Sequence, residues 1–167
     1  QRQMCIRDRD TVSGSILNIR VGGNDLSHAF GLRRPANRTI YDLRPVADIL
    51  IDIVAAFGTQ YVVSGPVWEY YSGEGWEEGL RREMELDLLN GFTGKTVIHP
   101  NQIPVVNEML RVSQRDYADA RAILNWDTGS GSLVSASEDG GRMNEYNTHS
   151  RWARRIVLRA ERYGVRA

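Results

Sequence analysis

The fold class of this chain is decided by residues 90–102, which read Asn-Gly-Phe-Thr-Gly-Lys-Thr-Val-Ile-His-Pro-Asn-Gln. A glycine-bounded turn leads into residues 96–98, where every side chain is β-branched, and this pattern predicts a buried strand. Pro100 follows at a position suited to the first turn of a helix. A turn, a buried strand, a sharp exit and a helix start together make one unit of an α/β fold.

Two further segments, residues 16–21 and 61–67, have the composition of buried strands and end at Gly-Gly or Gly-Pro turns. Amphipathic helical patterns cover residues 43–57, which Asp42 is placed to cap, and residues 77–89. Strands that alternate with helices in this way indicate successive βα units and a parallel sheet.

The rest of the chain is predicted to be helical around one loop. The helical period continues after the opening stretch, with Ile103 on the apolar face, and Ser113 with Asp116 resembles a capping box for a helix through residue 124. Residues 127–141 are rich in Gly, Ser and Asp and predict a loop or a weak hairpin. Residues 148–163 predict a last helix, whose basic face is expected to be solvated or to contact another subunit.

A phosphate-binding loop is the first functional interpretation to test, because Gly94-Lys95-Thr96 has the form of its end. The motif requires a glycine five residues before Gly94, where this chain has Leu89. The lysine also precedes the predicted strand, whereas a phosphate-binding loop follows a strand and opens a helix. A nucleotide-dependent enzyme is therefore the weakest of the functional interpretations.

The opening stretch resembles the last strand of the citrate lyase β-subunit-like, or HpcH/HpaI aldolase-like, family of TIM-barrel carbon–carbon lyases. The positions that match the family pattern are Gly94, Lys95, Ile98, His99, Pro100 and Gln102. The resemblance extends over residues 16–165 and implies an α/β fold, a partial TIM (β/α)8 barrel of the last three βα units with a C-terminal helical extension. A whole barrel takes about 250 residues, and five preceding units are absent from these 167 residues.

The chain is expected to divide into three parts. Residues 1–10 are expected to be a leader that is not native protein, the alternative being an ordinary polar leader. Residues 11–125 are expected to form the C-terminal part of the barrel domain, and residues 126–167 a loop and the helical extension. Because three barrel strands leave two unpaired edges and an uncovered inner face, we expect the isolated chain to aggregate or to be partly disordered.

The turn after residues 16–21 is the implied metal site. In the family the matching strand ends in Gly, a variable pair and Asp-Leu, so Asp25 is the implied Mg²⁺ ligand and Gly22, Gly23 and Asn24 are implied substrate-binding neighbours. A carboxylate oxygen suits this hard cation. The alternative is that Asp25 caps the helical turn that follows it. The second metal carboxylate of the family, a Glu of the preceding strand, is not in this sequence, so the chain alone is expected to be catalytically incomplete.

Four further residues are candidates for the same site. Arg33 and Arg34 follow the metal turn, where guanidinium groups can bind a carboxylate or phosphate of the substrate, unless the basic run is simply solvated. Glu69 lies among aromatic residues that would raise its pKa by desolvation, unless it points outward. His99 ends the last predicted strand, where it either orients the site or is tied into backbone hydrogen bonds at the turn.

The segment Gly141-Arg142-Met143-Asn144-Glu145 resembles a motif of acyl-CoA lyases, Gly-x-Met-x-Asp, whose Asp is a catalytic acid–base that reaches a neighbouring subunit's site. Glu145 takes the place of that Asp with a longer side chain, and His149 nearby is a further candidate. Together with the runs Ser-Gly-Pro-Val-Trp-Glu-Tyr and Ala-Glu-Arg-Tyr-Gly-Val, this segment looks more like the lyase-like proteins encoded in tellurium-resistance and stress gene clusters than like citrate lyase proper.

The function implied by the resemblance is a Mg²⁺-dependent carbon–carbon bond lyase. Its expected substrate is a small carboxylate, either a keto acid, a hydroxy acid or a coenzyme A thioester, and its expected assembly is a homo-oligomer. The alternative is a non-catalytic oligomeric interaction protein that keeps the barrel, because barrels host many functions.

Composition limits the partners and the compartment. The 21 basic and 21 acidic residues balance, which disfavours a nucleic-acid-binding surface. No apolar run approaches the roughly 20 residues that cross a bilayer. Cys5 is the single cysteine and cannot form an internal disulfide, and no signal-peptide pattern is present, so a cytoplasmic location is expected.

Overall fold

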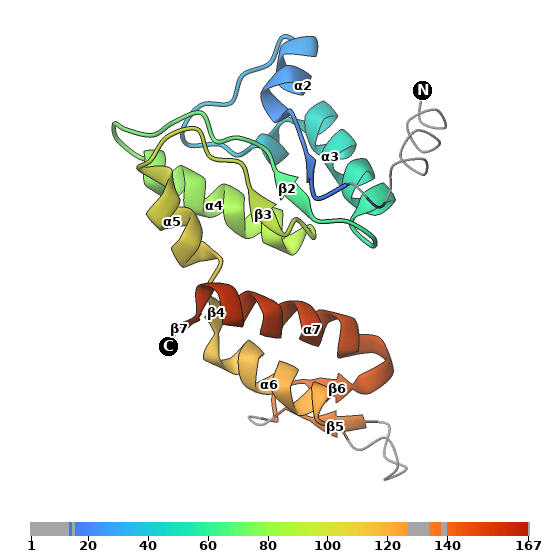
Figure 1. The fold of residues 1–167 in the computed structure, drawn as a ribbon. Coiled ribbons are helices and arrows are strands. Elements are labelled where there is room, and N and C mark those ends of the chain that lie inside the picture. The colour runs from blue at the N-terminus through green and yellow to red at the C-terminus, as the bar shows by residue number, and fades with distance from the viewer. Residues whose placement is uncertain (1–13, 15, 127–133, 138–139, 167) are drawn as a thin grey trace. The chain divides into compact units, whose positions relative to one another are not determined.

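The computed structural model describes residues 14, 16–126, 134–137 and 140–166 (Figure 1). The chain divides into two compact units, Gln1–Met109 and Leu110–Ala167, which we call unit 1 and unit 2 and describe separately. The leader expected at residues 1–10 lies outside the described residues, and the domain division expected after residue 125 stays a prediction.

Unit 1 contains a three-stranded parallel sheet in the order β1-β2-β3. The strands are short: β1 is Ile19–Arg20, β2 is Val63–Gly65 and β3 is Gly94–Lys95. In the register, Ser64 of β2 lies opposite Gly94 of β3, and the three strands lie side by side in Figure 1. The parallel βα arrangement predicted from the sequence is confirmed.

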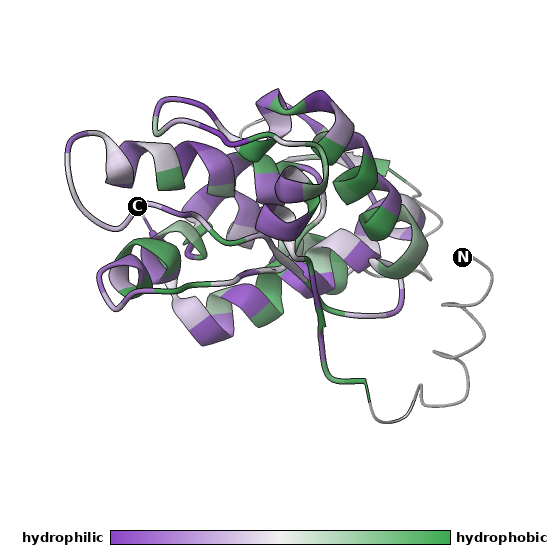
Figure 2. Cartoon of the chain, turned by 90° about the horizontal axis from the view of Figure 1, so that it is seen from above, coloured by the Kyte–Doolittle hydropathy of each residue, from purple (hydrophilic) through white to green (hydrophobic). Residues whose placement is uncertain are grey.

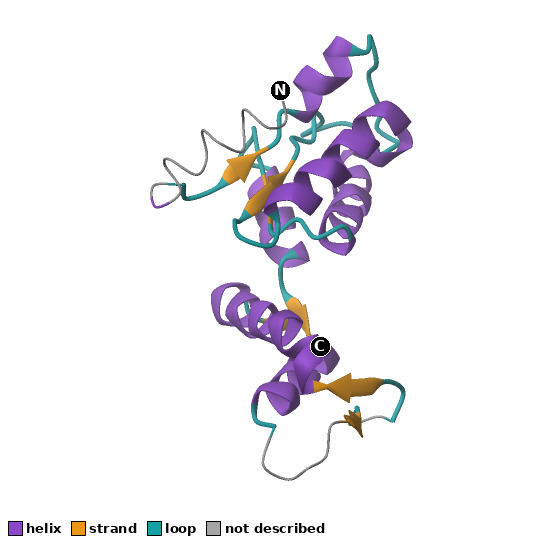
Figure 3. Cartoon of the chain, turned by 90° about the vertical axis from the view of Figure 1, so that its right-hand side faces the viewer, coloured by secondary structure: helices purple, strands orange, loops and turns teal. Residues whose placement is uncertain are grey.

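Helices contain far more residues of unit 1 than strands do, as Figure 3 shows by colour. Apolar and polar residues alternate along the helices in Figure 2, as expected where one face of a helix is buried. In chain order the helices are α2 (Gly23–Ala29), the 3-10 helix η2 (Ile40–Asp42), α3 (Arg44–Phe57), α4 (Trp76–Leu89) and α5 (Gln102–Met109).

The core of unit 1 joins α3 to the sheet. Val46 and Leu50 of α3 are fully buried and belong to one cluster with Val21, Val63 and Phe92, which lie in or beside the strands. Complete burial of one such aliphatic side chain stabilises a fold by about 1.5–3 kcal/mol. The apolar stripe predicted for this helix therefore holds it against the sheet.

The last strand lies two residues earlier than predicted. The prediction of a buried strand at residues 96–98 is wrong, because Val97 and Ile98 are 36% and 55% exposed. The pairing strand β2 ends at Gly65 and is followed by Pro66, which has no N–H with which to extend a ladder. β-branched composition alone cannot show where the partner strand ends.

The predicted cap of α3 is also wrong. The residue that precedes α3 is Leu43, which makes no side-chain cap hydrogen bond. Asp42 instead accepts hydrogen bonds from the backbone N–H of Thr39 at 2.7 Å and from its hydroxyl at 3.0 Å. The Thr-x-x-Asp spacing thus closes a capping box around η2, one element earlier.

The apolar face predicted for α5 is displaced. Ile103 is 47% exposed, whereas Gln102 is fully buried. The Gln102 amide donates to the carbonyls of Trp68 and Tyr70 at 2.9 and 2.8 Å and accepts from the N–H of Ile98 at 3.0 Å. This side chain therefore joins the segment after β2 to the segment after β3. The buried residues of α5 are Gln102, Val105, Val106 and Met109.

Unit 2 is a pair of packed helices with two small sheets. The predicted cap of its first helix is confirmed, since the Asp116 N–H donates to the Ser113 hydroxyl oxygen at 3.1 Å. The helices are α6 (Gln114–Leu124) and α7 (Tyr146–Tyr163), and the strands are β4 (Val112–Ser113), β5 (Val134–Ala136), β6 (Met143–Glu145) and β7 (Val165–Arg166).

The small sheets and α7 agree with the sequence pattern where they are described. β5 and β6 pair antiparallel, which confirms the hairpin alternative for that part of residues 127–141, while residues 127–133 and 138–139 lie outside the described residues. β4 pairs with β7 in parallel. α7 ends at Gly164, as predicted, where a φ of 85° favours glycine. The buried core consists of Val112, Ala120, Ile123, Ala153, Ile156 and Ala160.

The position of Gly79 in α4 generates a stability prediction. A Cβ there would lie 2.6 Å from the Ala36 carbonyl oxygen and would overlap the ring of the buried Trp68. Alanine gains about 1 kcal/mol over glycine in a free helix, but overpacking costs about 1–3 kcal/mol. We expect the overlap to dominate, so Gly79→Ala should lower the free energy of unfolding in urea. Gly14→Ala, which meets nothing within 4 Å, is the control, and an unchanged or higher stability of Gly79→Ala would contradict this packing.

Candidate functional site

The end of β1 places the predicted metal residues at an edge of the sheet. The Gly23 N–H donates to the Val21 carbonyl at 3.0 Å, and the Leu26 N–H donates to the Gly22 carbonyl at 3.0 Å. The chain therefore turns from the strand directly into α2. Active sites of TIM barrels lie at this edge, where the carboxyl ends of the parallel strands meet.

Close packing requires glycine at both turn positions. A Cβ on Gly23 would lie 2.5 Å from the Cβ of Pro66 and 2.7 Å from Cδ1 of Ile40. A Cβ on Gly22 would lie 2.5 Å from Oδ2 of Asp25. Gly23 thus allows the turn to lie against the end of β2, and Gly22 leaves the space into which the Asp25 carboxylate folds back.

The Asp25 carboxylate is exposed, and it accepts no hydrogen bond from the residues that the structure describes. The alternative that Asp25 caps the helix is wrong, because the cap residue of α2 is Gly22 and no side chain caps that helix. An unpaired carboxylate beside the space kept by Gly22 is the kind of oxygen donor that Mg²⁺ binds.

The number of metal ligands that the described residues offer is small. No group of three or more His, Cys, Asp or Glu side chains in the described parts of the chain lies close enough to hold a metal ion. Mg²⁺ is usually held by only one or two protein carboxylates and keeps several waters. The donor set at the end of β1 therefore fits Mg²⁺ as the source of one carboxylate ligand, Asp25.

Arg33 and Glu69 form an ion pair after β1 and β2. Arg33 Nε lies 2.9 Å from Glu69 Oε2. The Glu69 side chain is only 14% exposed, so the alternative that it points outward is wrong, while the Arg33 side chain is 78% exposed. Arg33 thus keeps a cationic surface that can reach a carboxylate in solution, and Glu69 limits the positions of its guanidinium.

Arg34 is fully buried, so the interpretation of the basic run as solvated is wrong for this residue. Its Nε lies 3.0 Å from Glu83 Oε2, and Nη2 donates to Glu83 Oε1 at 3.3 Å and to the Val67 carbonyl. Nη1 donates to Asn24 Oδ1 at 3.5 Å. The two Nη donors are directed at protein atoms, whereas Nε, although close to Glu83, makes no hydrogen bond with the described residues. Arg34 is thus buried behind the edge of the sheet, away from solvent.

Arg34 belongs to a cluster of four buried charges, which we call the charge cluster: Arg34, Glu83, Asp87 and Lys95. Lys95 Nζ donates to Glu83 Oε1 at 2.8 Å and to Asp87 Oδ2 at 2.7 Å, and these three side chains are at most 2% exposed. The Tyr41 hydroxyl donates to Asp87 Oδ1 at 2.7 Å. Two cations and two anions make the cluster formally neutral. A lysine buried in β3 also agrees with the rejection of a phosphate-binding loop.

The pKa values in the charge cluster follow from burial and from the neighbouring charges. Burial lowers the pKa of Lys95, but Asp87 and Glu83 outweigh it and raise the pKa above its ordinary value. Burial raises the pKa of Asp87, and Lys95 partly offsets this rise. Burial and the Asp87 charge raise the pKa of Tyr41, so its hydroxyl stays protonated and donates.

His99 is held by local contacts. Its ring stacks on Tyr71 with centroids 4.3 Å apart, and its Nδ1 accepts from the Asn101 N–H at 3.2 Å. The alternative of an imidazole tied to the backbone is therefore confirmed. Because Nδ1 is an acceptor, the neutral ring carries its proton on Nε2.

Glu145, in unit 2, lies where β6 meets α7 and is the cap residue of that helix, but its carboxylate makes no cap hydrogen bond. The Glu145 N–H donates to His149 Nδ1 at 3.0 Å, and the Thr148 hydroxyl donates to Glu145 Oε2 at 3.3 Å. Glu145 and His149, the two candidate site residues predicted in unit 2, thus lie in contact. A capping aspartate would direct its carboxylate to the N–H groups at the start of the helix. The Glu145 carboxylate is not used in this way and remains available for other chemistry.

Arg142 fixes the strand that leads to Glu145. Its Nη2 lies 2.8 Å from Asp116 Oδ1, its Nε donates to Asp119 Oδ2 at 2.6 Å, and its guanidinium lies 5.5 Å from the centroid of the Trp152 ring. Burial raises the pKa of Asp116, but the hydrogen bonds from Arg142 and Ser113 and the charges of Arg142 and Arg159 together outweigh it, so the pKa lies below its ordinary value. The hairpin is therefore held on α6 and α7 by charge-assisted contacts.

The sequence pattern did not predict the charge cluster or the Arg142 contacts. One signal was present: Glu83 and Asp87 lie four residues apart and flank the buried Met84 on the inner side of α4. Charged residues on an apolar stripe are expected to have buried partners. Lys95, in the Gly94-Lys95 pair of the sequence, is the partner of both carboxylates.

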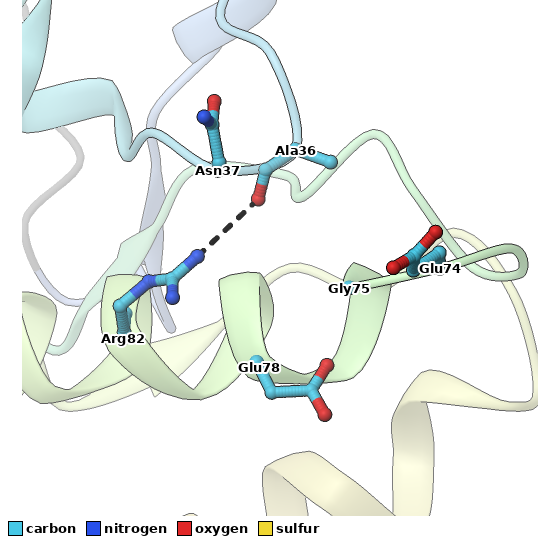
Figure 4. Close-up of a pocket in the computed structure, with 6 residues that line it drawn as sticks. All are labelled: Ala36, Asn37, Glu74, Gly75, Glu78 and Arg82. Carbon is cyan, nitrogen blue, oxygen red and sulfur yellow. Dashed lines mark hydrogen bonds between the residues drawn. The ribbon is translucent and has the colours of Figure 1, made fainter.

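A pocket of about 430 Å³ lies between the segment after β1 and the start of α4 (Figure 4). Arg82 Nη2 donates to the Ala36 carbonyl at 3.5 Å across this space. Its lining includes acidic, basic and amide residues, without a cluster of one kind. The lining residues are Ala36, Asn37, Glu74, Gly75, Glu78 and Arg82.

The charge cluster generates a prediction about Lys95. Lys95→Met leaves two buried carboxylates without their shared cation, and breaking a buried ion pair costs about 3–5 kcal/mol. The raised pKa of Lys95 contributes stability that is complete below about pH 10.5 and is lost as the pH rises through the folded-state pKa. In urea unfolding we therefore expect a large deficit for Lys95→Met at pH 7 that narrows above pH 10.5.

Arg44→Met is the matched control for this experiment, because Arg44 forms an exposed ion pair with Asp48 at 2.9 Å. Such pairs contribute little, about 0–1 kcal/mol. If Lys95→Met were as stable at pH 7 as Arg44→Met, the charge cluster would not be a main source of stability in unit 1.

Comparison with known proteins supplies relatives for this fold. L-malyl-CoA/β-methylmalyl-CoA lyases from two strains of Cereibacter sphaeroides are 38% and 36% identical to this chain over 74 residues, which is 43% of this chain and 22% of each relative. The structure of CitE from Mycobacterium tuberculosis, in complex with magnesium, acetoacetate and coenzyme A, matches with a TM-score of 0.60 and 28% identity. That match covers 85% of this chain and 51% of CitE, so this chain spans about half the length of that relative.

The fold of the chain agrees with the family whose model its sequence matches. Among the described helices, none is both long enough and apolar enough to span a bilayer. The three parallel βα units of unit 1 and the helices of unit 2 form a partial TIM barrel with a C-terminal helical extension. Residues 5–165 match the family described as C-C bond lyase of the TIM-barrel fold, and the chain belongs to this family.

Proposed function

We propose that the whole protein is a Mg²⁺-dependent carbon–carbon bond lyase acting on a small carboxylate or its coenzyme A thioester. The observation that carries this proposal is the exposed Asp25 carboxylate at the end of β1, which folds back over Gly22 and has no hydrogen-bond partner among the described residues. The malyl-CoA lyases and the CitE complex with magnesium, acetoacetate and coenzyme A support both the metal and the substrate class.

Each residue at the sheet edge has a part in this proposal. Asp25 provides one oxygen ligand, and bound magnesium supplies Lewis-acid polarisation of the substrate carbonyl. Arg33 binds the substrate carboxylate with its exposed guanidinium, which Glu69 holds in place. Gly22 and Asn24 lie on the exposed side of the turn beside Asp25, where substrate would bind, and Gly23 holds the turn against the end of β2.

Glu145 is the proposed acid–base. Cleavage turns the substrate hydroxyl into a carbonyl, which releases the hydroxyl proton. It also leaves an electron pair on the carbon next to the other carbonyl, and a proton must be added to that carbon. Glu145 has a carboxylate that is not used in capping, a hydroxyl donor in Thr148 and a neighbour in His149. The resemblance to acyl-CoA lyases supports its placement in the site of a neighbouring subunit of a homo-oligomer.

The alternative function is a non-catalytic oligomeric interaction protein that retains the barrel. It is favoured by the small number of metal ligands among the described residues. A cytoplasmic location and a tellurium-resistance or stress setting remain predictions from the sequence.

The metal assignment predicts the effect of Asp25→Ala. Loss of a direct ligand should weaken Mg²⁺ binding by at least about 100-fold, the upper end of what outer-shell substitutions cost. Calorimetry on the whole protein with Mg²⁺ and pyruvate measures this effect. Asp48→Ala, which removes an exposed carboxylate of α3, should bind as wild type does. Equal affinities of the Asp25→Ala and Asp48→Ala variants would refute the metal site, and absence of binding in the wild type would favour the interaction protein.

The acid–base assignment predicts a separate effect at Glu145. Glu145→Gln keeps the size of the side chain but cannot exchange a proton, so kcat for cleavage of malyl-CoA should fall about 10²–10⁴-fold. Glu145→Asp keeps the carboxylate and should retain most of the activity. Mg²⁺ affinity should be unchanged in both variants. Glu161→Gln, at an exposed position of α7, is the control, and wild-type turnover by Glu145→Gln would show that another group carries the proton.

A further inference from the structure

The charge cluster reaches the metal turn through one side chain, Arg34. Its Nη1 donates to Asn24 Oδ1 at 3.5 Å, the long end of hydrogen-bond distances, and Asn24 directly precedes Asp25. A guanidinium group has donors only, so the contact also fixes which end of the Asn24 amide faces inward. Within the described residues, this is the contact that links the charge cluster to the turn after β1.

The Arg34 guanidinium has little freedom of its own. Glu83 lies 3.0 Å from its Nε, the Val67 carbonyl accepts from its Nη2, and the Trp68 ring centroid lies 5.1 Å from its central carbon. Glu83 is itself held by Lys95 at 2.8 Å, and it also accepts from the Ile40 N–H at 2.8 Å. Arg34 is therefore a rigid donor attached to α4 and to the end of β2.

Burial makes the contact with Asn24 consequential despite its length. The Arg34 side chain is 0% exposed, so no bulk water replaces a lost acceptor at Nη1. A buried donor left without a partner costs about 1–3 kcal/mol, and more when the group is charged. The Asn24 side chain is consequently drawn toward the guanidinium, and the backbone of the turn follows it.

We propose that Arg34 is a positioning residue for the metal ligand Asp25. By fixing Asn24, Arg34 restricts the turn that presents the Asp25 carboxylate, as partners outside the direct ligands of a metal commonly do. This inference rests on the proposed function and deepens it: Arg34 acts on the metal site through Asn24, without touching substrate.

The test measures Mg²⁺ affinity by calorimetry without substrate, together with thermal stability, on the whole protein. Asn24→Ala removes the contact at an exposed position, and Arg34→Lys keeps the charge but lacks the planar fork that reaches Asn24. We expect each variant to raise the Kd about 10–100-fold. The double variant should bind no more weakly than the weaker single variant, because both remove the same contact.

Two controls separate positioning from general damage. Asn37→Ala removes an exposed asparagine from the following segment and should leave the Kd unchanged. Arg44→Met removes a cation from an exposed ion pair and leaves the charge cluster intact, so its Kd should stay within about twofold of wild type.

The outcomes distinguish this inference from the proposed function. If Asp25→Ala abolishes binding while Asn24→Ala and Arg34→Lys bind as wild type does, the positioning role is overturned and the metal site stands. Additive effects of the two substitutions would also overturn it, because they would show independent actions. If the wild type binds no Mg²⁺, or if Asp25→Ala changes nothing, both proposals fail.

Discussion

The bridge from Lys95 to Glu83 and Asp87 is the interaction on which unit 1 depends. It joins β3 to α4 at distances of 2.8 and 2.7 Å, and Glu83 passes the connection to Arg34 and so to the segment after β1. Buried charges are costly unless each has a partner, so these elements hold the cluster only when they are all in place. The cluster thereby selects one arrangement of strand, helix and turn.

The charge cluster connects the fold of unit 1 to the candidate site at the end of β1. The apolar core of Val46, Leu50 and Val63 holds α3 on the sheet, but apolar packing tolerates small shifts of the elements. Hydrogen-bonded charges have directional requirements that fix position more closely. The end of β1, with Gly22 and Asp25, lies at the margin of this polar framework, where an exposed carboxylate can be held in a defined place.

The sequence predicted the features that depend on neighbours along the chain. The βα alternation, the stripe of α3 and the Ser113 cap follow from local periodicity and spacing, while the metal role that the family motif implies for Asp25 stays a prediction. Features that depend on distant partners were not predicted. In the sequence, nothing distinguishes Arg34 from a solvated arginine, because its partner Glu83 lies 49 residues away. Ile98 was expected to be buried because composition does not show that β2 ends at Gly65.

The proposed function requires that the end of β1 holds a divalent metal. A crystal structure of the whole protein grown with Mn²⁺ in place of Mg²⁺, with anomalous data, tests it most directly, because Mn²⁺ prefers the same oxygen ligands and gives a signal of its own. We expect an anomalous peak within coordination distance of the Asp25 carboxylate. A peak elsewhere, with Asp25 unoccupied, would contradict it.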